Sequence, residues 1–241
     1  MNQSPIFLPP KSERAWVLHN VTDRFYQRPD VEACRTNNII YLRNWKCGST
    51  FYYNNFVKKF GWEPIHFTDI DWRHDHVFGH IMHQIQRRYK GVAEYMKMTG
   101  TAHLLERPDF AELVRHVPYF DIHSASYHDL FGAAAWLVDW IPLNGGTAAS
   151  IAHTEKLLWS RNIRIMGQWD WAWTHPSTQD LLDTEQRLQQ LWDEKDVGYS
   201  WNNICFDRDQ RLYNSVVEGF EPNAAVWSEA SWLRVRGRNG N

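Results

Sequence analysis

The most constraining feature of the sequence is a short apolar run that leads into a glycine-containing loop and then into a segment of helical character. Residues 38–42 (NIIYL) form a β-branched run that predicts a buried strand, and residues 49–60 favour a helix. The loop between them contains KCGST, residues 46–50. A strand, a tight loop and a helix in this order are typical of a layered α/β domain.

Runs of the same two kinds alternate along the rest of the chain. We expect strands over residues 62–67, 77–82 and 133–141, a strand or extended piece over 163–166, and helices over 84–98, 108–116, 148–159, 177–193 and 207–217. Strands that alternate with helices pair in parallel and are covered on both faces. The expected fold is therefore a P-loop-like three-layer sandwich, with a central parallel sheet flanked by helices.

The length of the chain indicates how these elements are grouped. A chain of 241 residues fits one domain better than two. Pro9 and Pro10 block regular structure, so residues 1–14 are expected to be a flexible arm and residues 15–241 a single domain. The net charge of -2 gives no global attraction to nucleic acid, so neither nucleic acid nor an anionic membrane is an expected partner.

The cysteines and the apolar segments indicate the compartment. Three widely spaced cysteines favour neither a disulfide framework nor a zinc cluster, which points to a reducing environment. The first 14 residues lack the pattern of a secretory signal, and no run approaches the roughly 20 apolar residues that span a bilayer. We therefore expect a cytoplasmic protein without a membrane span.

The KCGST loop carries the residue types that bind a phosphate group. Backbone N–H groups converge where a strand ends and a helix begins, and Gly48 allows close approach of the backbone. Lys46 supplies a positive charge, and the hydroxyls of Ser49 and Thr50 add hydrogen-bond donors. The lysine precedes the glycine, unlike in the Walker A pattern, so an ordinary NTPase is disfavoured. The alternative is a helix capped by Ser49 beside a surface lysine.

The loop resembles the 5′-phosphosulfate loop of sulfotransferases that use 3′-phosphoadenosine 5′-phosphosulfate (PAPS), especially the carbohydrate-type branch. This resemblance implies that PAPS, or its product 3′-phosphoadenosine 5′-phosphate (PAP), is bound by Lys46, Cys47, Gly48, Ser49 and Thr50. It also implies a nucleotide cosubstrate and a separate acceptor substrate as partners. The similarity covers about residues 38–217.

A second motif of that branch opens the helix after the third strand. It reads Arg, Asp, Pro, two variable residues, Arg, an aromatic residue, a variable residue and Ser, and residues 83–91 (HQIQRRYKG) take its place. Arg88 matches the second arginine, whereas His83 and Gly91 replace the arginine and serine that normally hold the 3′-phosphate. The resemblance therefore gives His83, Arg88 and Gly91 as further cofactor-binding positions. Neighbouring Arg87 and Lys90 could supply the missing charge, or the basic cluster could be a solvated helix face.

Two later segments add to the resemblance. Asp121-Ile122-His123 falls where the family has an Asp-x-His motif, and residues 206–213 (FDRDQRLY) resemble the closing helix of the family, which packs on the core. The implied reaction moves a sulfuryl group to an acceptor hydroxyl or amine, with a carbohydrate as one candidate acceptor. Lys46 would stabilise the leaving group and His123 would act as base, with His128 in reserve. A hydrogen-bonded structural role for His123 stays open.

Three features leave other interpretations open. The altered positions in the second motif also fit a non-catalytic phosphonucleotide-binding module. A metal enzyme is another possibility, because four histidines lie within ten residues: His74, His76, His80 and His83. No metal is expected, however, because carboxylates and cysteines do not accompany them. Alternate tryptophans at 169, 171 and 173 could form a stacking wall for the acceptor or could be buried.

Overall fold

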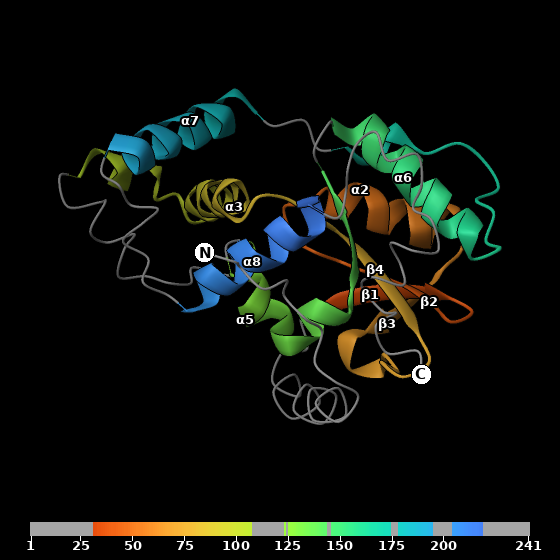
Figure 1. Cartoon of the computed structure of the whole chain (residues 1–241). Coiled ribbons are helices and arrows are strands. Elements are labelled where there is room, and N and C mark those ends of the chain that lie inside the picture. The colour runs from red at the N-terminus through yellow and green to blue at the C-terminus, as the bar shows by residue number, and fades with distance from the viewer. Residues whose placement is uncertain are drawn as a thin grey trace.

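The computed structural model of the protein describes residues 31–107, 123, 125–143, 146–174, 178–194 and 204–218. Its described residues form a mixed five-stranded sheet in the order β3-β1-β2-β4-β5 (Figure 1). The strands are β1 Glu32–Thr36, β2 Ile39–Leu42, β3 Glu63–His66, β4 His76–Ile81 and β5 Asp139–Pro142. The expected arm at residues 1–14, the expected helix at 108–116 and Asp121-Ile122 lie outside the described residues.

The sheet has a parallel half and an antiparallel half. β2, β4 and β5 pair in parallel, whereas β1 is antiparallel to both β2 and β3. The expectation of a purely parallel sheet is therefore wrong. The cause is a two-residue connection between β1 and β2, which only antiparallel strands can have. Asn37 in this connection has a φ of 52°, which asparagine tolerates better than most residues.

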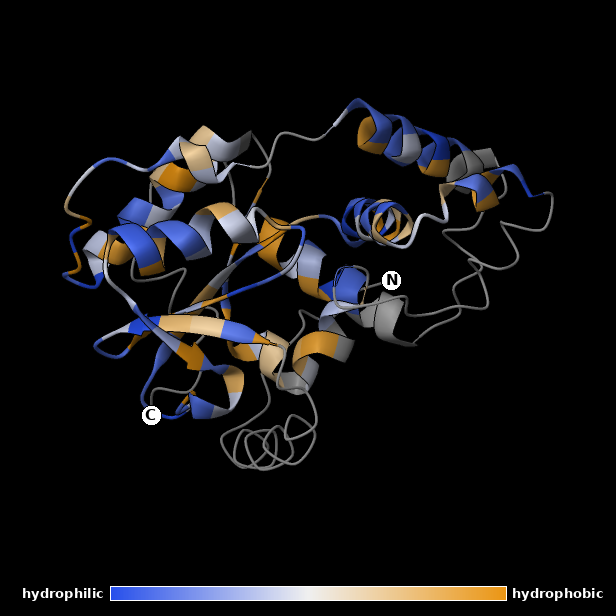
Figure 2. Cartoon of the chain, turned by 180° about the vertical axis from the view of Figure 1, so that it is seen from behind, coloured by the Kyte–Doolittle hydropathy of each residue, from blue (hydrophilic) through white to orange (hydrophobic). Residues whose placement is uncertain are grey.

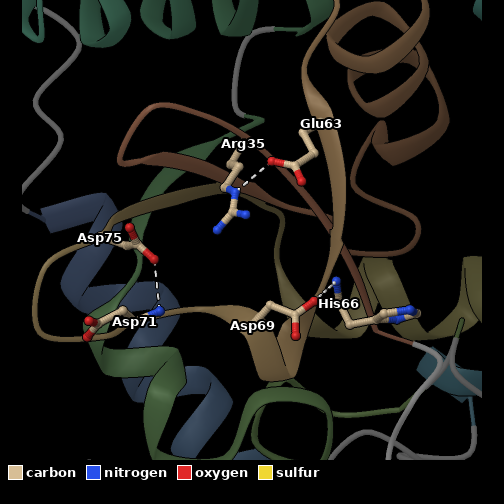
Figure 3. Close-up of polar contacts among 6 residues, drawn as sticks. All are labelled: Arg35, Glu63, His66, Asp69, Asp71 and Asp75. Carbon is tan, nitrogen blue, oxygen red and sulfur yellow. Dashed lines mark hydrogen bonds and ion pairs between the residues drawn. The ribbon is translucent and has the colours of Figure 1, made fainter.

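The edge of the antiparallel half is polar. Arg35 on β1 faces Glu63 on β3 in the strand register, and Arg35 Nε lies 2.9 Å from Glu63 Oε2 (Figure 3). Pro64 lies in the same edge strand, where a residue without an N–H does not interrupt the sheet. The expected strand over residues 62–67 is thus present, at the margin of the sheet.

Helices cover both faces of the sheet. The helices are α2 Ser49–Asn54, which continues as a π-helical turn over Asn55–Lys59, α3 Gln84–Thr99, α5 Tyr127–Phe131, α6 Gly146–Ser160, α7 Gln179–Glu194 and α8 Ile204–Glu218. One core cluster joins Ile40 and Leu42 of β2 to residues of α5 and α8, and another joins Ile39 and Tyr41 to residues of α2 and α6. Alternate side chains of β2 therefore point into two different cores, as expected for a strand buried on both faces.

α3 and α7 form a smaller core beside the sheet. Val92 and Met96 of α3 pack with Leu181 and Leu188 of α7, and the two helices lie together at one side of the molecule (Figure 1). Figure 2 shows that α7 is mostly hydrophilic, with hydrophobic residues along part of its surface. α3 therefore connects this satellite core to the sheet, because only two residues separate the end of β4 from the start of α3.

One local expectation was wrong in part, and another had left two outcomes open. Gly132–Leu137 forms a 3-10 helix, so only the last third of the strand expected over 133–141, residues 139–141, lies in a strand, β5. Residues 163–166 form no strand, which leaves the alternative of an extended piece. Every helix in the described part of the chain is too short or too polar to cross a bilayer.

Candidate functional site

The KCGST loop leaves the carboxyl end of β2, the edge at which ligands bind in parallel α/β sheets. Lys46 and Gly48 have left-handed backbone conformations, with φ values of 65° and 67°. Lys46 is the one described residue with a positive φ that is neither glycine nor asparagine. An L-residue pays a steric cost in this conformation, and such residues concentrate at binding sites. The loop backbone is therefore strained at the residue expected to hold the anion.

The start of α2 leaves backbone donors without helical partners. Gly48 is the N-cap residue, and no side chain caps the helix. The first N–H groups of a helix have no acceptor within the helix. The interpretation of Ser49 as a capping residue is wrong, because Ser49 is the first helical residue and its side chain is buried. Thr50 is half-buried.

The ammonium group of Lys46 is held close to the protein. Lys46 Nζ forms a short ion pair with Glu94 of α3, and its side chain is only 18% exposed. The alternative of a freely solvated surface lysine is therefore wrong. Glu94 gives the ammonium group a counter-ion in the absence of a ligand, so an incoming anion must share or replace that contact.

A buried asparagine and cysteine support the loop from beneath. The Asn44 side chain is fully buried and donates to the carbonyl oxygen of His80 at 2.7 Å, which ties the loop to β4. Cys47 is also fully buried, and its N–H donates to the carbonyl oxygen of Asn44 at 3.2 Å. Burial raises the pKa of the Cys47 thiol, so it stays neutral and packs as an apolar group.

His123 lies beside this loop although it is distant in sequence. Its ring packs edge-on against the ring of Trp45, with 4.9 Å between centroids, and Trp45 directly precedes Lys46. Arg43 Cζ lies 3.8 Å from the centroid of the same Trp45 ring. The structure thus brings together the loop and the histidine that the sequence analysis names as base. The side chain of His128 lies outside the described residues.

The second motif begins where β4 ends. His83 is the N-cap residue of α3, and its ring packs edge-on against Tyr213 of α8 at 5.1 Å. Its partial burial lowers the pKa of His83, which favours the neutral form of the ring. Arg88 and Gly91 are buried within α3. The interpretation of the basic cluster as a solvated helix face is therefore wrong for Arg88.

Tyr127 joins the segment that carries His123 to the rest of the site, a role the sequence analysis missed. Its hydroxyl group donates to the carbonyl oxygen of Met82 at 2.6 Å, and its backbone N–H donates to Asp209 Oδ2 of α8 at the same distance. Asp209 is buried in the closing helix, whose Leu212 and Tyr213 belong to the core as expected. A tyrosine four residues after His123 gives no sequence signal that distinguishes it from other core aromatics.

Two of the four histidines considered for a metal site have separate partners. His74 Nδ1 contacts Asp71 Oδ2 at 2.7 Å on the surface, whereas His80 is fully buried and its Nε2 lies 3.0 Å from Thr154 Oγ1. No three His, Cys, Asp or Glu side chains gather around a metal position in the described part of the chain. These residues therefore do not favour the metal-enzyme alternative.

The three alternate tryptophans have different environments. Trp169 is buried and donates from Nε1 to Glu155 Oε1 at 2.7 Å, whereas Trp171 is 53% exposed and its ring lies 5.3 Å from that of Phe51. Trp173 is half-buried, with Lys58 Nζ 4.3 Å from its ring centroid. A continuous stacking wall does not exist, and Trp171 alone offers an open ring beside α2.

Comparison of the chain with protein-family models, curated proteins and solved structures found no match.

Proposed function

We propose that the protein is a sulfotransferase that moves a sulfuryl group from PAPS to a hydroxyl or amine of an acceptor molecule. The observation that carries this proposal is the loop after β2, where Lys46 and the donors at the start of α2 lie next to a ring contact with His123. An anion-binding loop with a nearby titratable histidine is what sulfuryl transfer requires. The described sheet, with parallel strands and helices on both faces, is compatible with a P-loop-like sandwich.

The residues of the site have distinct tasks in this reaction. The acceptor oxygen or nitrogen forms a new bond to sulfur while the bond between sulfur and the bridging oxygen breaks, and PAP leaves with that oxygen. Lys46 and the N–H groups of Gly48, Ser49 and Thr50 stabilise the charge that develops on PAP. His123 takes the proton of the acceptor group. Because the ammonium group of Lys46 already pairs with Glu94, PAPS must share this ammonium group with Glu94 or displace Glu94 when it binds.

The 3′-phosphate position needs a separate account. The His83 ring, whose pKa is lowered by burial, provides no fixed charge, and the buried Gly91 provides no side-chain donor. Arg88 is buried in α3, as Gly91 is, and it is the remaining residue of the second motif that could bind this phosphate. The replacement of the family's arginine and serine by His83 and Gly91 also favours a second candidate function, a phosphonucleotide-binding module without turnover.

Thermal unfolding in the presence of PAP tests the proposal. PAP raises the melting temperature of the wild-type protein, and Lys46→Ala removes most of that shift. Lys59→Ala is the matched control, because Lys59 is exposed at the far end of the same helical segment. No shift at millimolar PAP contradicts both candidate functions.

Turnover separates the two candidates. The production of PAP from PAPS in the presence of sugar and phenol acceptors indicates a sulfotransferase, whereas PAP binding without turnover indicates the binding module. His123→Ala is expected to abolish turnover and to leave the dissociation constant of PAP unchanged. If His123→Ala weakens PAP binding as much as turnover, His123 is a structural residue.

A further inference from the structure

Arg87 contacts both segments that make up the candidate site. It lies in the first turns of α3, and its side chain is only 2% exposed. Its Nε donates to the carbonyl oxygen of Trp45 at 2.9 Å, and its Nη1 donates to the carbonyl oxygen of Ala125 through a short hydrogen bond. Its Cζ also lies 4.9 Å from the centroid of the Tyr127 ring. One guanidinium group therefore joins the KCGST loop to the segment that follows His123.

The contact with Trp45 fixes the peptide group in front of Lys46. In a planar trans peptide, the carbonyl oxygen and the following N–H point in opposite directions. When Arg87 holds the oxygen of Trp45, the N–H of Lys46 must therefore point away from the Arg87 guanidinium group. This peptide group precedes the strained left-handed conformation of Lys46, which needs support from its surroundings.

The contact with Ala125 fixes the other half of the site. Ala125 is fully buried and lies two residues after His123, and Tyr127 anchors the same segment to Met82 at the end of β4. A guanidinium group is planar and rigid, so two of its N–H groups define the direction of two acceptors at once. A lysine in this position carries its donors on one atom of a flexible chain, so it would not define the two directions in the same way.

We infer that Arg87 is a positioning residue that sets the placement of the KCGST loop relative to the His123 segment. It acts through two backbone carbonyl groups and not through contact with the cofactor. This assignment rests on the proposed function for the chemical tasks of Lys46 and His123. The mechanical link between the two segments does not depend on it.

Hydrogen exchange of the ligand-free protein tests the mechanical link. Arg87→Lys is expected to increase amide exchange in residues 44–50 and 125–131 together. Arg35→Lys is the matched control, since Arg35 pairs with Glu63 at the distant sheet edge (Figure 3), and it should leave both segments unchanged. Unchanged exchange in Arg87→Lys, or a change in one segment only, overturns the inference. Arg87→Gln, which keeps a side-chain donor without the charge, serves as the second variant if Arg87→Lys fails to fold.

Kinetics test the consequence for the reaction. A displacement of about 1 Å can reduce turnover about 100-fold, so Arg87→Lys should lower kcat by about 10- to 100-fold. The dissociation constant of PAP should change much less than kcat. Equal losses in PAP affinity and kcat mean that Arg87 contacts the cofactor, which overturns the inference. A wild-type protein that does not bind PAP contradicts the proposed function, and the exchange experiment then still decides whether Arg87 links the two segments.

Discussion

His80 makes the stability of the fold depend on pH. The ring is fully buried in β4 and stacks on the ring of Tyr52, with 3.6 Å between centroids and an angle of 16°. Its Nε2 lies 3.0 Å from Thr154 Oγ1, and its Nδ1 has no hydrogen-bond partner in the described part of the protein. Burial lowers the pKa of His80 from 6.5 to about 3. The folded protein therefore keeps this imidazole neutral across most of the acid range.

The size of the effect follows from the difference between the two pKa values. Between about pH 6.5 and pH 3 the unfolded chain binds a proton at His80 and the folded protein does not, so the free energy of unfolding falls as the pH falls. Each pH unit in this interval is worth about 1.4 kcal/mol. At pH 5, about 1.5 units below the unfolded pKa, His80 should have removed about 2 kcal/mol of stability.

Urea unfolding at pH 7, 6 and 5 measures this loss when wild-type protein is compared with His80→Gln. The glutamine stays neutral and can still reach Thr154, although loss of the ring contact with Tyr52 should cost about 1 kcal/mol at pH 7. The pKa values of His83 and His153 are also lowered by burial, so both proteins retain some pH dependence. The difference between their slopes isolates His80. Equal slopes for the two proteins would refute the reasoning, because His80 would then titrate alike in the folded and unfolded states.

Three further predictions concern a glycine of the sheet, a glycine of the loop with its control, and the counter-ion of Lys46. Gly79→Ala places a Cβ atom 2.8 Å from the Trp140 ring, so it should lower the urea unfolding free energy by about 1–3 kcal/mol, and an unchanged midpoint would mean that the ring can move aside. Gly48→Ala should lower the free energy of unfolding by about 1–2 kcal/mol, because alanine is strained at this positive φ, and it should also weaken PAP binding. Gly61→Ala is the control: Gly61 has a similar φ and open space around it, so this substitution should lower the free energy of unfolding without weakening PAP binding. Glu94→Gln removes the counter-ion of the loop lysine and should lower the dissociation constant of PAP in calorimetry at low salt, and unchanged affinity would show that the ion pair persists with ligand bound.

The local elements of the fold were predictable because they depend on side-chain periodicity. The strand expected over 38–42 is β2, and the helix expected over 84–98 is α3, within one residue at each end. β1 was missed, although the Asn37-Asn38 pair between two β-prone runs is a hairpin signal. Strand direction depends on which strands are joined by tight turns, so missing β1 also led to the wrong prediction of an all-parallel sheet.

The candidate site was predictable only where its residues are contiguous in sequence. The KCGST loop combines a strand end, a glycine and a helix start within a few residues, so its local conformation can be predicted from the sequence. The partners of the loop come from elsewhere: Glu94 and Arg87 from α3 and Tyr127 from a later segment. A charged residue on an amphipathic helix usually faces solvent, and the burial of Arg87 became apparent only with the two carbonyl groups that satisfy it.

The energetics of the loop explain why these distant partners are needed. A lysine in the left-handed conformation costs roughly 1–2 kcal/mol, which a short loop cannot offset with its own contacts. Asn44 holds the loop to β4 from below, while Arg87 and Glu94 hold the backbone and the ammonium group from α3. Hydrogen bonds to charged groups contribute about 1.5–3 kcal/mol each, enough to stabilise the strained conformation before any ligand is present. Placing two opposite charges seven residues apart on one helix therefore lets α3 prepare the loop for an anion without adding net charge to it.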